Sequence, residues 1–184
     1  MGGAANKIGS KFIKMKVLVV IKRSVLERYS KSNDNQVREF AQKDKKIKSM
    51  HENEQKSIKK VLQKLDQLNI EHDHLFRDEL KKVDDVDLVI TVGGDGTFLD
   101  VSHFINDNTP ILGINSNPKV SVGFFCVATA DNFSDYLEGT KTKLKRLKLT
   151  LNGQELSGLV LNDLLIAHTN PAATTLYEIN GNVY

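Results

Sequence analysis

Residues 93–97 (GGDGT) carry the side-chain types best suited to chemistry, and they directly follow the apolar run at residues 87–92 (DLVITV). Glycines between a buried strand and a helix allow a sharp turn and let backbone N–H groups face an anion, and the N-terminus of the next helix adds a positive dipole. The pattern therefore predicts a phosphate or pyrophosphate site. It is not a P-loop, because GxxxxGK[ST] is absent, and it is not the GxGxxG fingerprint.

Asp95, in the middle of this turn, needs an explanation of its own. A carboxylate next to phosphates is electrostatically unfavourable unless it binds a metal ion or accepts a proton from an attacking hydroxyl. The competing interpretation is that Asp95 only caps the following helix, as aspartates commonly do. The flanking glycines after a predicted strand favour the chemical role.

The elements that must position this turn follow from the hydrophobic pattern. Apolar runs predict strands at residues 16–21, 70–76, 87–92 and 110–114, and helical spacing predicts helices at about residues 54–68, 97–105 and 131–138, with a weaker one around residues 37–41. We expect Asp131 to cap the helix at 131–138 and Gly139 to end it. This order predicts an α/β fold, a Rossmann-like nucleotide-binding domain with a parallel sheet over residues 15–144, whose ligand lies beyond the carboxyl ends of the strands. Residues 1–14 lack periodicity and are interpreted as a disordered leader.

The character of the chain changes near residue 145. Leucines at 147, 149 and 151 alternate with polar residues, and Asn152-Gly153 is the strongest two-residue hairpin signal. The return strand is predicted to continue to residue 166, so residues 145–184 are expected to begin an all-β domain. About three strands can hardly bury a core, so we expect this domain to be incomplete. Either it pairs with another chain or the polypeptide is a fragment.

Composition excludes several classes. Cys126 is the single cysteine of the 184 residues, so no internal disulfide can form, and no Cys/His cluster predicts a metal site. No apolar run approaches the roughly 20 residues of a spanning helix, and we expect a cytoplasmic protein without a membrane partner. Residues 1–92 hold 20 Lys and Arg against 14 Asp and Glu, but no aromatic residues interleave with the lysines, so nucleic-acid binding is not expected.

Three segments resemble the NAD kinase family. GGDGT is shared by NAD kinases, diacylglycerol and sphingosine kinases and, in a close variant, 6-phosphofructokinases, all of which transfer a phosphoryl group to a hydroxyl. Residues 110–118 (PILGINSNP) and 122–125 (VGFF) look like the NAD kinase segment and unlike that of the lipid kinases. Residues 161–166 (LNDLLI) resemble the NAD kinase Asn-Glu motif, with Asp163 in place of Glu. The resemblance covers about residues 16–179, is closer to the mitochondrial-type members and their prokaryotic relatives, and implies a C-terminal truncation.

The resemblance implies phosphoryl transfer from ATP, or from polyphosphate, to the 2′-hydroxyl of the adenosine ribose of NAD. Asp95 would deprotonate that hydroxyl, and the backbone of the glycine turn would hold the phosphates, with Mg²⁺ neutralising charge on the donor. Asn162 and Asp163 would bind ribose hydroxyls and the adenine of NAD. Phe124 would pack on a base or ribose, or else fill the core; Asn115 would touch the dinucleotide, or else fix its loop. The nucleotide-binding set is therefore Gly93, Gly94, Gly96, Thr97, Asn115, Phe124, Asn162 and Asp163.

Two other functions remain open at this point. A lipid kinase of the diacylglycerol or sphingosine type shares the glycine turn, and a non-catalytic nucleotide-binding fragment would follow if a C-terminal segment is missing. The family also implies NAD and ATP as partners and a homo-oligomer, either dimer or tetramer.

Overall fold

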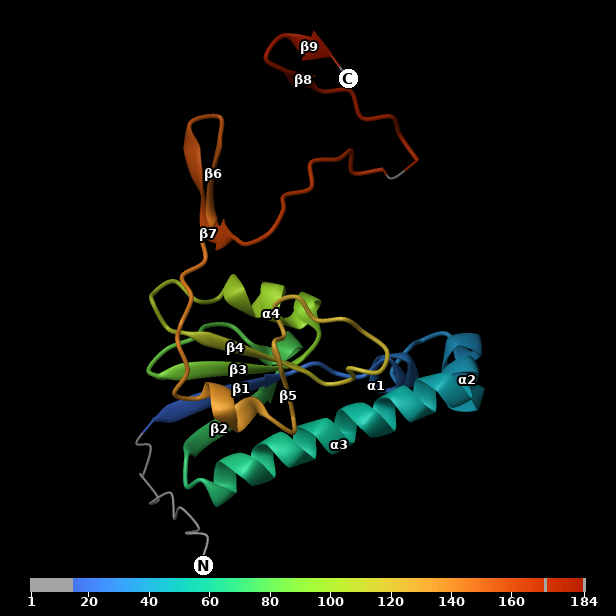
Figure 1. The fold of residues 1–184 in the computed structure, drawn as a ribbon. Helices are drawn as coiled ribbons and strands as arrows, with labels where there is room; N and C mark the ends of the chain where they lie inside the picture. The colour runs from blue at the N-terminus through green and yellow to red at the C-terminus, as the bar shows by residue number, and fades with distance from the viewer. Residues whose placement is uncertain (1–14, 171, 184) are drawn as a thin grey trace, which may run out of the picture.

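A five-stranded parallel sheet forms the centre of the molecule, seen in a computed structural model that describes residues 15–170 and 172–183 (Figure 1). The predicted leader at residues 1–14 lies outside the described residues. The strands are β1 (Lys16–Ile21), β2 (Glu71–Phe76), β3 (Leu88–Gly93), β4 (Ile111–Asn115) and the short β5 (Ala128–Thr129), in the order β2-β1-β3-β4-β5. The predicted α/β fold with a parallel sheet is confirmed.

The sheet is buried on both faces, as expected for valine- and isoleucine-rich parallel strands. On one face, α3 (Lys45–Gln67) buries Val61 and Leu65 against β1, β3 and β4. On the other face, Val101 of α4 (Asp95–Ser102) packs with Leu80 and Val83, which belong to the connection from β2 to β3. Both layers hold the carboxyl ends of the central strands in fixed positions.

The strand order places a topological switch point between β1 and β3. The chain leaves β1 towards β2 on one side and later returns to β3 on the other side. Open α/β sheets with this order bind ligands in the crevice beyond the carboxyl ends at such a point. In this protein the residues after β1 and the glycine turn after β3 lie at this point, where the N–H of Lys22 donates to the carbonyl of Val92.

The helices before β2 are longer and more numerous than predicted. Besides α2 (Asn35–Lys43), a short α1 (Val25–Ser30) forms, and α3 begins nine residues before the predicted helix at 54–68. The sequence did carry the α1 signal: Ser24 accepts a hydrogen bond from the N–H of Glu27, whose carboxylate accepts one from the N–H of Ser24. This is a capping box, which marks a helix start.

The predicted helix at 131–138 is wrong. Only a 3₁₀ turn, η2 (Phe133–Tyr136), forms there, and another, η1 (Arg77–Glu79), follows β2. Asp131 caps nothing, because its carboxylate pairs with Lys60 of α3 and the side chain of Asn132 instead accepts from the N–H of Thr129. The predicted end at Gly139 is also wrong, because η2 ends at Tyr136 with Leu137 as its C-cap, although the N–H of Gly139 donates to the carbonyl of Tyr136. The apolar content of this segment indicated burial rather than a full helix.

The C-terminal part contains two antiparallel hairpins that extend away from the sheet (Figure 1). They are β6 (Leu147–Leu151) with β7 (Gln154–Val160), and β8 (Glu178–Ile179) with β9 (Asn182–Val183). Asn152 and Gly153 both have positive φ, at 51° and 77°, as the predicted two-residue turn requires. The return strand stops at Val160 instead of residue 166, and Asn162 takes φ 84° shortly after. The boundary near residue 145 and the incompleteness of the β domain stay predictions.

Candidate active site

The glycine turn joins β3 to α4 and leaves part of its backbone open. Gly93 ends β3, Gly94 is the N-cap and Asp95 is the first residue of α4. None of these glycines needs positive φ; Gly94 has φ −119°. A Cβ added at Gly93 would lie 2.3 Å from Oγ1 of Thr97, whereas one added at Gly94 or Gly96 would meet no atom within 4 Å. Gly93 is therefore required for packing, whereas Gly94 and Gly96 leave open space beside the backbone.

Asp95 holds a loop that comes from a distant part of the sequence. Its Oδ2 accepts a hydrogen bond from the N–H of Phe124 at 2.7 Å, and its Oδ1 accepts from the N–H groups of Phe125 at 2.9 Å and Cys126 at 3.1 Å. The capping interpretation is therefore incorrect as stated, because no side-chain hydrogen bond caps α4. The carboxylate instead ties the N-terminus of α4 to the segment that leads into β5.

These hydrogen bonds set the charge state of Asp95. Partial burial acts to raise the pKa of its carboxyl, but the three backbone N–H donors together outweigh burial and hold the pKa below its usual range. Asp95 is thus an ionised acceptor at neutral pH. The thiol of Cys126 forms a further hydrogen bond with this carboxylate. Oδ2 accepts a single backbone N–H, that of Phe124.

The other limb of the same loop is fixed by Asn115, at the end of β4. Its Nδ2 donates to the carbonyl of Ser121 at 2.9 Å, and its Oδ1 accepts from the N–H of Asn117 at 3.0 Å. The side chain is 5% exposed. Of the two roles left open for Asn115, the structure shows that of fixing the loop.

Close packing against this loop explains two more glycines. A Cβ on Gly113 would lie 2.9 Å from both Cα of Cys126 and the carbonyl oxygen of Phe125, and one on Gly123 would lie 2.8 Å from the carbonyl oxygen of Cys126. Both distances are shorter than real Cβ contacts. Any side chain at these positions would push the loop away from β4 and from Asp95.

Phe124 points outward from this fixed loop. Its side chain is 81% exposed, while Phe125 stacks on Phe98 of α4 with ring centroids 5.3 Å apart and Cys126 is 5% exposed. The core alternative for Phe124 is therefore excluded, and Cys126 is the residue of this segment that lies in the core. The loop presents an apolar ring beside the glycine turn.

Two predicted groups do not join the turn as expected. Thr97 is buried, and its N–H donates to the carbonyl of Gly94 at 2.8 Å, so this amide has no free hydrogen for a phosphate. Asn162 and Asp163 are exposed and hydrogen-bonded to each other at 2.9 Å, on the segment that follows β7 outside the α/β layers. The structure does not bring them to Asp95.

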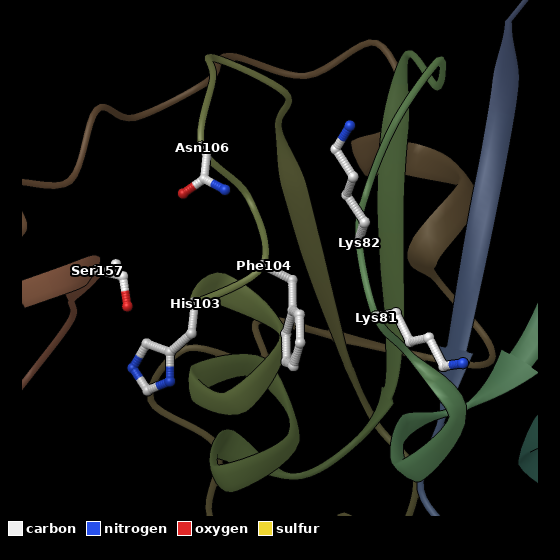
Figure 2. Close-up of a pocket in the computed structure, with 7 residues that line it drawn as sticks. Lys81, Lys82, His103, Phe104, Asn106 and Ser157 are labelled. Carbon is white, nitrogen blue, oxygen red and sulfur yellow. The ribbon is translucent and has the colours of Figure 1, made fainter.

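A cavity of about 260 Å³ lies elsewhere, between Lys81, Lys82, the end of α4 at His103 and Ser157 of β7 (Figure 2). It adjoins the C-terminal end of α4, so it is separate from the glycine turn, which lies at the other end of the helix. Within residues 15–170 and 172–183, no group of three His, Cys, Asp or Glu side chains could hold a metal ion. In the same residues no helix is long and apolar enough to cross a membrane.

These features define an α/β protein of Rossmann-like fold, with a switch point, an open glycine turn at a helix N-terminus and an ionised acceptor beside that turn. A family model described as the ATP-NAD kinase N-terminal domain matches residues 4–142. The chain belongs to the NAD kinase family, as the resemblance predicted.

The relatives to which the chain is similar are named NADH kinases or NAD kinases. The chain is 39% identical over 117 residues to a probable NADH kinase of Oryza sativa subsp. japonica, a match that covers 52% of this chain and 36% of the relative. It is 36% identical over 129 residues to an NADH kinase of Arabidopsis thaliana (58% and 40% covered) and 31% identical over 138 residues to an NAD kinase of Clostridium beijerinckii (69% and 48% covered). The chain thus spans less than half the length of these relatives. None of these matches supports the lipid kinase alternative.

Proposed function

We propose that this protein is an NAD kinase, which transfers the γ-phosphoryl group of ATP, or a phosphoryl group of polyphosphate, to the 2′-hydroxyl of the adenosine ribose of NAD. The observation that carries the proposal is the ionised carboxylate of Asp95, placed at the N-terminus of α4 with bare glycine backbone on either side. Membership of the NAD kinase family supports the acceptor.

The donor phosphates are assigned to the backbone at Gly94 and Gly96. The first N–H groups of a helix have no acceptor within the helix, and the positive end of the dipole of α4 points at them. Open space at both glycines lets a phosphate reach these groups. Mg²⁺ enters with ATP as part of the substrate, since the described residues offer no three-ligand cluster of their own. The ion neutralises charge on the phosphates.

Asp95 is assigned the 2′-hydroxyl, accepted at Oδ2. A carboxylate whose pKa is lowered is a weak base, so its main contribution is to orient the hydroxyl for in-line attack and to receive its proton late. This suits phosphoryl transfer, whose loose transition state depends on positioning and electrostatics more than on early proton removal. Loss of this group is expected to lower kcat by roughly 10² to 10⁴.

Three further assignments belong to the same proposal. The exposed ring of Phe124 stacks on a base or ribose of NAD. Asn162 and Asp163 reach the ribose hydroxyls and adenine when the segment after β7 folds over the crevice. The protein is cytoplasmic and assembles as a dimer or tetramer, for which the exposed Leu147, Leu151 and Leu156 of β6 and β7 offer apolar surface.

The test is NADP formation by the purified chain with Mg²⁺, NAD and either ATP or polyphosphate, read through glucose-6-phosphate dehydrogenase. Asp95→Asn should lose nearly all activity, while Asp100→Asn, which changes an exposed residue of the same helix, should keep it. Unchanged activity in Asp95→Asn would overturn the assignment of Asp95. Tight ATP binding without any NADP would favour the non-catalytic alternative.

A further inference from the structure

The buried face of α3 changes from apolar to polar along the helix. Where α3 covers the sheet, this face consists of Val61 and Leu65, both fully buried. Towards the N-terminus the same face continues with Glu54, which is 6% exposed, and the half-buried His51. Figure 1 shows that this half of α3 runs past the sheet towards α1 and α2. The polar part of the face therefore lies at the carboxyl ends of the strands.

Hydrogen bonds tie this polar part of α3 to the switch point. Oγ of Ser24, a residue 1% exposed just after β1, lies 2.8 Å from Nδ1 of His51. The N–H of Lys22 donates to the carbonyl of Val92 at 3.1 Å, which sets the end of β1 beside the residue before Gly93. On the other side, Oγ of Ser57 donates to the carbonyl of Ser116 at 2.8 Å. The polar part of the buried face of α3 thus lies between the end of β1 and the loop that Asp95 and Asn115 hold.

Oε2 of Glu54, on α3, is buried and has no hydrogen-bond partner among the described residues. Leaving a carboxylate oxygen buried and unpaired is costly. Burial raises the pKa of the Glu54 carboxyl, and the negative charge of Glu27 raises it further. Lys22, His51 and Arg28 act to lower this pKa, but burial outweighs them. A ligand that donates hydrogen bonds would relieve the unpaired oxygen.

We propose that Glu54 and His51 form a ribose-binding subsite on α3, with the vicinal hydroxyls of a nucleotide bound there while its phosphates lie on the glycine turn. This inference rests on the proposed nucleotide-dependent function. Carboxylates beside a switch point are suited to ribose hydroxyls, because each hydroxyl donates to an oxygen that is already desolvated. A phosphate does not fit, since Glu54 would repel it, and a metal ion does not fit, since the described residues supply no third ligand.

The ribose belongs either to ATP or to NAD, and calorimetric titration separates the two. The chain, Glu54→Gln and the control Glu52→Gln, which alters an exposed residue of the same helix, are each titrated with ATP, 2′,3′-dideoxy-ATP and NAD. If the subsite holds the ribose of ATP, removal of the hydroxyls weakens binding to the unchanged chain about tenfold, Glu54→Gln weakens ATP about as much, and this variant no longer distinguishes the two donors. If it holds a ribose of NAD, Glu54→Gln weakens NAD alone.

Equal affinities of Glu54→Gln and the unchanged chain for all three ligands would overturn the subsite, as would an equal loss for ATP and dideoxy-ATP in that variant. Should Glu54→Gln fail to fold, His51→Gln carries the same comparison at a half-buried position. The two proposals fail differently. If the unchanged chain forms NADP and Glu54→Gln has unchanged nucleotide affinities, only the subsite proposal is refuted. If the unchanged chain binds neither ATP nor NAD, the subsite and the proposed function are both refuted.

Discussion

Replacing Asp95 by alanine should release the loop at residues 123–126 from α4. The three N–H groups of Phe124, Phe125 and Cys126 would lose their shared acceptor, while the stacking of Phe125 on Phe98 and the burial of Cys126 remain. The loop should therefore open locally without unfolding the sheet. Amide hydrogen exchange at these three positions, measured by NMR, reports this opening directly.

The size of the effect follows from the hydrogen bonds. One hydrogen bond to a charged group contributes about 1.5 to 3 kcal/mol, and three on one carboxylate are not additive. We expect the free energy of local opening to fall by about 3 kcal/mol in Asp95→Ala, which corresponds to roughly hundredfold faster exchange at the three amides. Asp100→Ala is the control, because it removes only an exposed carboxylate paired with Arg77 and should cost less than about 1 kcal/mol.

The pH dependence has a definite sign. Because the folded-state pKa of Asp95 lies below its ordinary value, its stabilising contribution is complete above that ordinary value and is lost as pH falls through the lowered one. Protection factors at Phe124, Phe125 and Cys126 should stay constant from pH 7 down to about pH 4 and decline below it. Unchanged protection in Asp95→Ala at pH 7, or a decline that begins near pH 6, would refute the hydrogen-bonding scheme.

Three further outcomes are expected. Gly93→Ala should lower the free energy of unfolding by about 1 to 3 kcal/mol, because the new Cβ meets Oγ1 of Thr97, whereas Gly94→Ala should unfold like the unchanged chain and yet bind ATP more weakly; denaturant titration and calorimetry compare the pair. The thiol of Cys126, whose pKa burial and the neighbouring Asp95 raise to about 12, should resist iodoacetamide at pH 8 until the chain unfolds, and mass spectrometry of the folded chain showing rapid alkylation would contradict this. Arg146→Ala should lower the melting temperature, because Nη1 of Arg146 donates to the carbonyl of Ser102 at 2.9 Å and to that of Ile105, just after α4, at 2.6 Å. The free energy of unfolding should fall by about 1 to 2 kcal/mol, whereas Lys145→Ala, at an exposed position, should leave it unchanged.

The sheet could be predicted because its strands are short runs of branched apolar residues with clear ends. β1, β3 and β4 lie within a residue of their predicted positions. The helices were predicted less well, since α1 and the first turns of α3 are polar and extend past the sheet, where no core imposes a periodic apolar pattern. Their signals are local instead: the capping box at Ser24 and the hydrogen bond from the N–H of Ile47 to Asp44.

The site could be predicted only in part. The sequence located Asp95 and the glycines, but not the contacts of Asp95, because its partners are backbone N–H groups 29 to 31 residues away that leave no signal in residue type. The sequence also could not predict that Phe124 is exposed and Phe125 partly buried, since two adjacent phenylalanines do not show which ring faces outward. Buried polar residues such as Glu54 are found only when packing is known.

The glycines now separate into two kinds with different consequences for the site. Gly93, Gly113 and Gly123 have neighbours where a side chain would begin, so they let β3, β4 and the loop approach one another and bring Asp95 to its three donors. Gly94 and Gly96 have open space there, so only these two can lie against a ligand. Under the proposed function, a phosphate would therefore bind at Gly94 and Gly96, next to the loop that Asp95 holds and from which the ring of Phe124 points outward. A side chain at either glycine would then weaken phosphate binding without disturbing the fold, whereas a side chain at Gly93, Gly113 or Gly123 would disturb the fold first.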